Sequence, residues 1–338
     1  MSDHGNGAAV EMRKAGVGMF ADVEPGQLPT GKKTFIGVGG GFDILTALAF
    51  QQCQREENGE TGPIPAVAVV IHDKAHKWVP EQWENAEMVE NRIYHLDGRC
   101  RYDRPRDYFM NRKNSRGEEV PRTPAHALLG FMLTGKKVTG PEDWLSPREN
   151  LVENIYLIIV SPGPRHAQER EQILRDLFSL EAFKGTIPVM VDTGADVTDP
   201  TDDQDYPLAV AAKRSFPEAV VVVVAPGADG QLSGKYPDDG VQTSKNWQLL
   251  DMRAELIQPP SGFFGFLEKC MDPWDDADDR TPGIFLEACR LADGDPDRTF
   301  GIQRFHAKEG VPPVILTASF VATMWKVIIP DPDPDTDN

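Results

Sequence analysis

The sequence is poor in cysteine, with only four in 338 residues, and no two of them form a Cys-x-x-Cys pair. Cys53 and Cys289 fall in stretches that we predict to be helical, while Cys100 and Cys270 stand far from them along the chain. Widely separated cysteines of this kind favour reduced, buried thiols, as in a cytosolic protein.

Long apolar runs and an excess of basic residues are also missing. No apolar run approaches the roughly 18–20 residues that cross a bilayer, and the opening MSDHGNGAAVEMRKAG contains no apolar core of a signal peptide. There are 35 basic and 53 acidic residues, which gives a formal net charge of −18. Because such a surface repels nucleic-acid phosphates and anionic membranes, we expect neither as a partner. We predict a cytoplasmic protein with a small-molecule substrate, and the sequence leaves oligomer formation open.

Several catalytic motifs are absent as well. The chain contains no G-x-S-x-G, H-E-x-x-H or G-x-x-x-x-G-K-[ST] motif. His72 and His76 are four residues apart and would share one face of a helix, but no third zinc ligand accompanies them. The motifs that remain therefore consist mainly of glycine and aspartate.

Hydrophobic residues make up 40% of the chain and include six tryptophans, which indicates a folded protein. We predict a flexible arm over residues 1–30, one α/β domain over 31–329 and a disordered acidic tail over 330–338. Residues 99–147 are irregular, basic and aromatic, and we interpret them as an insertion or a lid.

Apolar runs of strand length alternate with amphipathic stretches along most of the chain. The runs are continuous in valine and isoleucine, which is typical of strands buried on both faces. This alternation predicts βαβ crossovers and a doubly wound, mostly parallel sheet with helices on both faces. We expect strands at 33–39, 66–71, 93–96, 154–160, 187–192, 219–226, 299–305 and 325–329, and helices at 43–54, 166–183, 208–216, 244–257 and 283–292.

Charged residues follow five of the predicted strands, each after a glycine, a proline or a short turn. In open α/β sheets, ligands collect beyond the carboxyl ends of the strands. We therefore expect these side chains to share one edge of the sheet and to form the active site. They are Asp43, Asp73, Arg165, His166, Asp192, Asp196 and Asp229.

The first of these positions follows three glycines in GVGGGFD. A dinucleotide fingerprint fails there, because Phe42 stands where the last glycine of G-x-G-x-x-G belongs. Asp43 would occupy the N–H groups that a phosphate would otherwise bind, either as a plain helix cap or as a ligand to a cation. With Asp192, the strongest single candidate, it suits Mg²⁺ or a cationic group of a substrate. Turn formation is the alternative for Asp192.

The other charged residues receive roles in the same hypothesis. Asp196 or Asp229 would act as the catalytic base beside Asp192. Arg165 and His166 would hold an anionic group, or His166 would act as a general acid. In the alternative of a nucleotide-dependent enzyme, Asp73 would bind the ligand through a ribose hydroxyl of the cofactor.

The segments GVGGGFDILTALA, VSPGP, VDTGAD and VVVAPGADGQLS resemble the DUF1152 family over about residues 34–232. The chain departs from the family pattern at Phe42, Ala195 and Gln231. The resemblance implies a Rossmann-like fold and a common site, and it implies no particular activity. It marks Gly39, Gly40, Gly41, Asp43, Asp192, Gly194, Asp196, Gly227, Asp229 and Gly230.

Three functions from different classes are consistent with these observations. The leading hypothesis is a hydrolase or group transferase that acts on a polar metabolite and binds a divalent metal or a cationic group through its carboxylates. The second is a nucleotide-dependent oxidoreductase or methyltransferase, so a nucleotide cofactor is left open. The third is a non-catalytic scaffold that uses an apolar patch around residues 259–271, although FFGF is more typical of a core.

Overall fold

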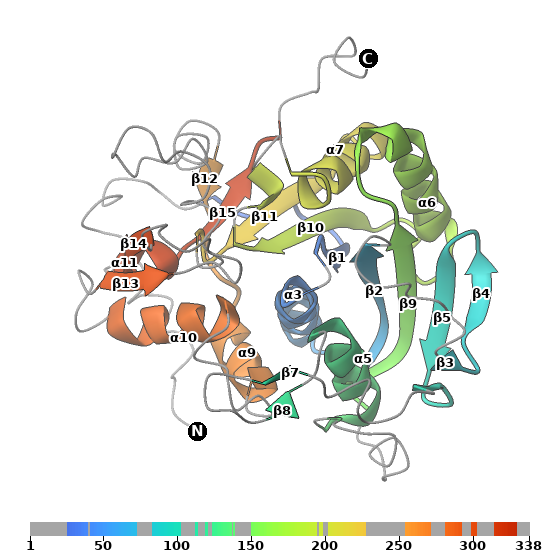
Figure 1. The fold of residues 1–338 in the computed structure, drawn as a ribbon, viewed down its shortest axis with the longest axis horizontal. Helices are drawn as coiled ribbons and strands as arrows, with labels where there is room; N and C mark the ends of the chain where they lie inside the picture. Colours follow the sequence, from blue (N-terminus) through green and yellow to red (C-terminus); the bar gives the residue numbers. More distant parts are fainter. Residues whose placement is uncertain are drawn as a thin grey trace.

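Two β-sheets form the centre of the protein in a computed structural model (Figure 1). The structure describes residues 26–39, 41–72, 83–102, 112–113, 119–120, 124–136, 138, 150–194, 196–198, 202–227, 254–271, 281–292, 299–302 and 314–329. All statements below concern these residues.

The first sheet has five strands in the order β1-β10-β11-β15-β12. Its first three strands run parallel, β15 runs antiparallel to β11, and β12 runs antiparallel to β15. The sequence of β11 is five consecutive valines, which suits a strand covered on both faces. The strands are β1 (Lys33–Gly37), β10 (Ile187–Thr193), β11 (Val220–Val224), β15 (Met324–Val327) and β12 (Ala254–Leu256).

The second sheet has four strands in the order β2-β9-β5-β4. Only β2 and β9 are parallel, and the outer strands are antiparallel to their neighbours. β2 lies beside β1, so the two parallel groups are adjacent (Figure 1). The described sheets are therefore parallel at the centre and antiparallel toward the edges. The strands are β2 (Ile64–His72), β9 (Val152–Val160), β5 (Ile93–Asp97) and β4 (Glu87–Glu90).

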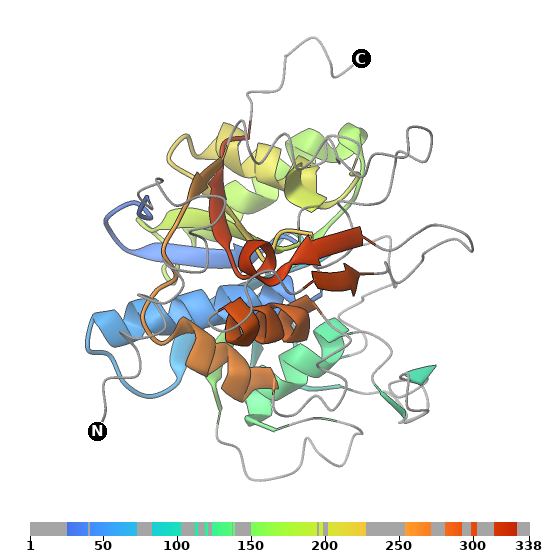
Figure 2. The same cartoon turned by 90° about the vertical axis from the view of Figure 1, so that its left-hand side faces the viewer.

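Helices cover both faces of these strands (Figure 2). Alternate residues of a strand point to opposite faces, so Phe35 belongs to one hydrophobic core and Ile36 to the other. In the helix over 167–179, Ile173, Leu174 and Leu177 form one buried face, as the sequence predicts. One face packs against α3 (Asp43–Glu57), α5 (Pro124–Thr134), α9 (Phe263–Met271) and α10 (Thr281–Ala292), and the other against α6 (Ala167–Ser179) and α7 (Asp205–Ser215).

Short elements complete the described structure. Three two-stranded ribbons pair β3 with β6, β7 with β8 and β13 with β14. Their bounds and those of the remaining short helices are β3 (Trp83–Glu84), β6 (Arg101–Tyr102), β7 (Arg112–Lys113), β8 (Glu119–Val120), β13 (Thr299–Ile302), β14 (Val314–Thr317), η4 (Pro164–His166), η5 (Asp196–Thr198) and α11 (Ala318–Val321).

The structure corrects one sequence expectation and confirms another. The predicted helix at 244–257 is wrong over Ala254–Leu256, which form β12, because pairing with β15 places this segment at a sheet edge. The segment 259–271 contains helix α9, and its Phe263 and Leu267 are buried in the core. The interpretation of FFGF as core is therefore confirmed for Phe263.

All four cysteines have free thiols, and Cys53, Cys100 and Cys270 are buried. Cys53 lies in α3 and Cys289 in α10, as the sequence predicts. Of the helices that the structure describes, none combines the length and the apolar content needed to cross a membrane.

Candidate metal site

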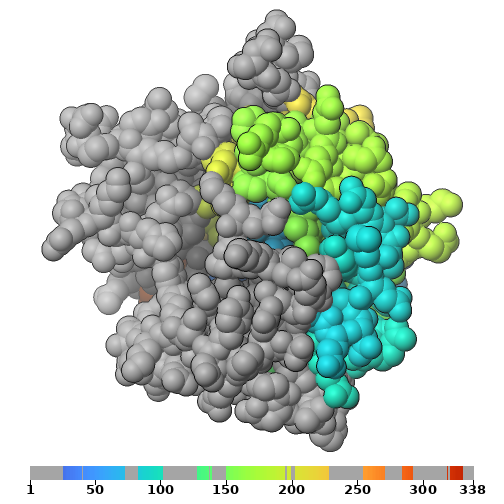
Figure 3. Space-filling view, turned by 45° about the vertical axis from the view of Figure 1, so that its right-hand side comes forward, coloured from blue at the N-terminus to red at the C-terminus, as the bar shows by residue number. Residues whose placement is uncertain are grey.

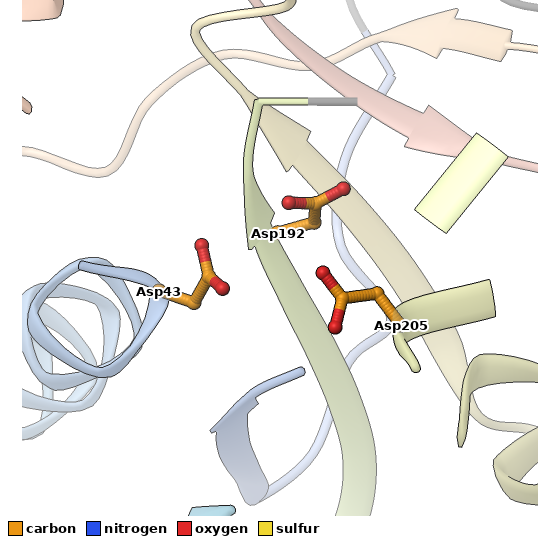
Figure 4. Close-up of side chains that lie close together, drawn as sticks. All are labelled: Asp43, Asp192 and Asp205. Carbon is orange, nitrogen blue, oxygen red and sulfur yellow. The ribbon is translucent and has the colours of Figure 1, made fainter. Parts of the chain in front are cut away.

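Three aspartates from distant parts of the chain meet at the carboxyl end of β10 (Figure 4). Asp43 is the first residue of α3, Asp192 lies near the end of β10, and Asp205 is the first residue of α7. Each offers one carboxylate oxygen, and these three oxygens lie within 4.8 Å of one another. The residues are 8%, 2% and 8% exposed, respectively. We call this group the Asp triad.

Two glycines let the start of α3 approach the end of β1. A Cβ on Gly37 would lie 2.5 Å from the carbonyl carbon of Asp43 and 2.6 Å from the nitrogen of Ile44. A Cβ on Gly39 would lie only 2.2 Å from Oδ2 of Asp43 and 3.4 Å from Oδ2 of Asp205. Any larger residue at either position would therefore collide with the helix or with the Asp triad.

Backbone N–H groups hold two of the carboxylates. The N–H of Thr193 donates to Oδ1 of Asp43 over 2.7 Å, and the N–H of Val197 donates to Oδ2 of Asp192 over 2.9 Å. The first bond joins α3 to β10, and no side-chain hydrogen bond caps α3 at Phe42. Asp43 is therefore the first residue of α3 rather than its N-cap residue, and its carboxylate links the helix to β10. Asp192 does close the local turn that leads to Val197, so its turn-forming alternative is true in part.

Asp205 is the member of the triad that the sequence did not predict, because the expected helix began at residue 208. Helix α7 begins three residues earlier. Asp202 closes the turn before the N-cap residue Gln204: its Oδ1 accepts hydrogen bonds from the N–H groups of Gln204, at 2.9 Å, and Asp205, at 2.6 Å. Burial, followed by the charge of Asp205, raises the pKa of the Asp202 carboxyl. Asp202 thus serves the turn, and the Asp205 carboxylate belongs to the triad.

His72 supports Asp205 from the end of β2. Its Nε2–H donates to the carbonyl oxygen of Val38 over 2.8 Å and lies 3.4 Å from Oδ1 of Asp205. Burial of the ring by itself would lower the pKa of His72. The hydrogen bond and charge of Asp205, together with the Val38 carbonyl, outweigh burial and leave this pKa above its ordinary value.

His72 is 3% exposed, and its buried Nδ1 has no hydrogen-bond partner among the described residues. Because it ends a strand, the sequence's expectation of a helical face shared with His76 does not hold at His72. His76 itself lies outside the described residues. Among the described residues, His72 therefore contacts Asp205 from the end of β2.

The other predicted residues are not members of the triad, and some of them lie outside the described residues. Asp196 starts η5 and is not one of the three grouped carboxylates, and Arg165 and His166 lie in η4 after β9. Gly194 and Gly227 have φ angles of 143° and 76°, which favour glycine, while a Cβ on Gly41 would meet open space. Gly40, Asp73, Asp229 and Gly230 lie outside the described residues.

A large cavity lies at the other end of the molecule. It has a volume of about 1050 Å³ and is lined by residues near the carboxyl ends of α3 and α5 and along α9, among them Glu56, Phe131 and Phe266. This cavity adjoins the starts of β2 and β9, which is the edge of the sheet opposite the Asp triad. The Asp triad and this cavity are therefore separate sites.

The described residues thus define a mixed α/β protein with a buried three-aspartate group that could hold a metal ion. Comparison with known proteins found no matching family model, no matching curated protein and no matching solved structure.

Proposed function

We propose that this protein is a metal-dependent enzyme, a hydrolase or group transferase, that acts on a small polar metabolite. The observation that carries the proposal is the convergence of three buried carboxylates from α3, β10 and α7 within 4.8 Å. Oxygen ligands of this kind suit a hard divalent cation, and Mg²⁺ is the cation that we assign to Asp43, Asp192 and Asp205.

Charge balance supports a bound cation. Three ionised carboxylates at this separation repel one another by about 3 kcal/mol per pair at an effective dielectric constant of 20. His72 lies within ion-pair distance of Asp205. A divalent cation bound among the three carboxylates would offset their mutual repulsion.

A bound Mg²⁺ would supply Lewis-acid polarisation of a substrate oxygen or an activated water. The chain's own groups fix the ligands: the N–H groups of Thr193 and Val197 orient two carboxylates, and His72 orients the third. Asp196 and Asp229 remain the predicted bases, and Arg165 and His166 the predicted partners of the substrate's anionic group.

We also propose that the fold is a doubly wound, Rossmann-like variant and that the chain is a distant relative of the DUF1152 family. The parallel central strands, the helices on both faces and the glycines between β1 and α3 support this interpretation. The free thiols support a cytoplasmic location. The two alternative functions gain less support: Asp43 places a carboxylate at the N-terminus of α3, where a cofactor phosphate would otherwise bind, and Phe263 of the suggested scaffold patch is buried.

Calorimetric titration of the metal-free protein with Mg²⁺ and Mn²⁺ tests the proposal directly. The wild type should bind one divalent ion, and Asp192→Asn should bind it at least tenfold more weakly because an amide oxygen carries no charge. Glu181→Gln is the matched control, since Glu181 is exposed and the variant loses the same formal charge. Circular dichroism and a melting curve should show that Asp192→Asn is folded.

Equal affinity of Asp192→Asn and wild type for the cation would refute the proposal. So would the absence of binding to the folded wild type at millimolar Mg²⁺ and Mn²⁺.

A further inference from the structure

Basic residues gather at the carboxyl end of β9, in a protein whose net charge is −18. Arg170 lies in α6 and is only 2% exposed, and its Nη1 donates to the carbonyl oxygens of Ser161, at 2.7 Å, and Gly163, at 2.8 Å. Its buried Nε–H has no hydrogen-bond partner, and no carboxylate of a described residue lies within ion-pair distance. A buried, unpaired guanidinium therefore lies beneath the loop that follows β9.

Further charged side chains lie around this loop. Arg92, from the turn before β5, contacts Oε1 of Glu169 at 2.7 Å and donates to Oγ of Ser161 over 3.0 Å. Nδ1 of His166 lies 2.8 Å from Oε2 of Glu169, and Nε of Arg165 donates to Nε2 of His166 over 3.0 Å.

His166 therefore lies between Arg165 and Glu169. Arg92, Arg165 and Arg170 thus contribute three guanidinium groups around this loop, and Glu169 contributes a carboxylate. Figure 3 shows residues of the β4–β5 region, in cyan, beside those of β9 and α6, in green, on this face.

The start of α6 adds backbone donors. Neither η4, which begins after Gly163, nor α6, which begins after His166, has a side-chain cap. α6 is 13 residues long, and its first-turn N–H groups carry the positive end of the helix dipole. The N–H groups of His166 and Ala167 donate to the carbonyl oxygens of Gly163 and Pro164, which leaves the later N–H groups of the first turn of α6. Helix N-terminal N–H groups and guanidinium groups are the donors that proteins use to bind oxyanions.

The same loop lies beside the elements that carry the Asp triad. Val160, which precedes it, pairs with His72, and His72 contacts Asp205. The N–H of Gly163 donates to the carbonyl oxygen of Asp203 over 2.7 Å, two residues before Asp205. The acidic and the basic groups are therefore neighbours at one edge of the sheets.

We infer that the loop 161–166 and the first turn of α6 bind a phosphoryl group of the substrate. This inference rests on the proposed function, since the cation at the Asp triad would share that substrate. Mg²⁺ in enzymes is commonly held by one or more carboxylates together with substrate phosphates. A phosphoryl group offers three acceptor oxygens to the guanidinium and N–H donors around this loop, whereas a carboxylate offers two.

Phosphate binding can be measured on the intact protein by calorimetry and by ³¹P NMR, with inorganic phosphate as the probe, with and without Mg²⁺. Arg165→Ala should weaken binding about tenfold, the loss typical of one charge-assisted hydrogen bond. Arg175→Ala is the matched control, because Arg175 is an exposed arginine of the same helix that contacts Glu171. A third variant, Arg170→Lys, should weaken binding while keeping the buried charge. Acetate should bind more weakly than phosphate.

Equal weakening by Arg165→Ala and Arg175→Ala would mean that only overall charge matters, and it would overturn the inference. Acetate binding as tightly as phosphate would replace the phosphoryl group by a carboxylate. The cation titration of Asp192→Asn separates the two proposals. Cation binding without phosphate binding removes this inference alone, and Arg165-dependent phosphate binding without cation binding removes the metal site alone.

Discussion

Gly39 is the residue on which the geometry of the Asp triad depends most directly. Its φ is not in the left-handed region, so space and not backbone freedom demands glycine there. Because a Cβ would lie 2.2 Å from Oδ2 of Asp43, Gly39→Ala must displace that carboxylate. We expect a loss of about 1–3 kcal/mol in the free energy of unfolding and weaker cation binding, measured by urea denaturation and Mn²⁺ titration.

Gly41→Ala is the control for this prediction, because a Cβ at that position meets nothing within 4 Å. Its free energy of unfolding should stay within about 0.5 kcal/mol of wild type. If both alanine variants behaved alike, the tight approach of β1 and α3 would not be what positions Asp43.

The single residue Cys53 also makes the free energy of unfolding depend on pH. Burial first, and then the charges of Glu56 and Glu57, raise the pKa of its thiol to about 12, against about 8.5 in an unfolded chain. The folded state therefore favours the protonated thiol, and its contribution to stability is complete below about pH 8.5 and is lost as the pH rises toward 12.

Compared with Cys53→Ala, the wild type should lose about 2 kcal/mol of its free energy of unfolding between pH 8 and pH 10. The alanine variant contains every other titrating group, so the difference between two urea denaturation series isolates the thiol. Parallel stability curves for the two proteins would show that Cys53 is accessible to water in the folded state.

At the level of single residues, the sequence predicted two of the three members of the triad. Asp43 and Asp192 could be predicted because each follows an obvious buried strand. Asp205 could not, because three acidic residues precede Tyr206, and only the folded structure shows that Asp202 closes the turn before the helix while Asp205 joins the triad. A run of aspartates identifies a helix start, but not which carboxylate turns inward.

Helix α5 raises the main question at the level of secondary-structure elements, since it lies within the segment 99–147 that the sequence suggests is an insertion or a lid. Leu128, Leu129 and Leu133 of this helix are no more than 1% exposed and belong to the core that also contains α3. If α5 is an integral part of that core, Leu129→Ala should cost about 2–5 kcal/mol of the free energy of unfolding.

Leu177→Ala in α6 is the matched comparison, because Leu177 is equally buried in the other core. Both variants should destabilise by similar amounts in chemical denaturation. A cost below about 1 kcal/mol for Leu129→Ala alone would identify α5 as a detachable lid.

The elements that the sequence predicted best are those with a clear period or a long apolar run. β2, β9, β10, α3 and α6 all agree with the expected ranges within a few residues. β12 was assigned to a helix because three residues of an edge strand carry too little pattern to compete with a flanking helical signal, and its strand pairing comes from β15. Antiparallel edges of this kind depend on tertiary contacts that no local pattern contains.

At the level of the whole molecule, the net charge of −18 makes the chain repel itself, and the Asp triad concentrates that repulsion at one buried point. Sodium chloride should stabilise the protein by general screening. A divalent cation that binds only the folded state should add RT ln(1 + [L]/Kd), about 2.7 kcal/mol at a concentration one hundred times Kd. The two effects separate when MgCl₂ and NaCl are compared at equal ionic strength.

Asp43→Asn should be more stable than wild type without divalent cations and less stable than wild type with them. An asparagine oxygen can still accept the hydrogen bond from Thr193, so the variant loses one charge and keeps the contact. Without divalent ions, removal of about 3 kcal/mol of repulsion per neighbouring carboxylate outweighs the roughly 0.3–1 kcal/mol of helix-dipole stabilisation, and the variant should melt above wild type. With excess Mg²⁺ the order should invert, because only the wild type gains from binding.

Thermal melts of wild type, Asp43→Asn and Glu181→Gln in EDTA and in MgCl₂ at equal ionic strength provide the measurement. Glu181→Gln removes the same formal charge from an exposed position, so it should respond to Mg²⁺ as the wild type does. If the order of the melting temperatures of wild type and Asp43→Asn inverts between EDTA and MgCl₂, both the repulsion among the carboxylates and the binding of the cation are required to explain it. If Asp43→Asn melted below wild type in EDTA and responded equally to Mg²⁺, the three carboxylates would be a proton-sharing structural cluster and not a metal site.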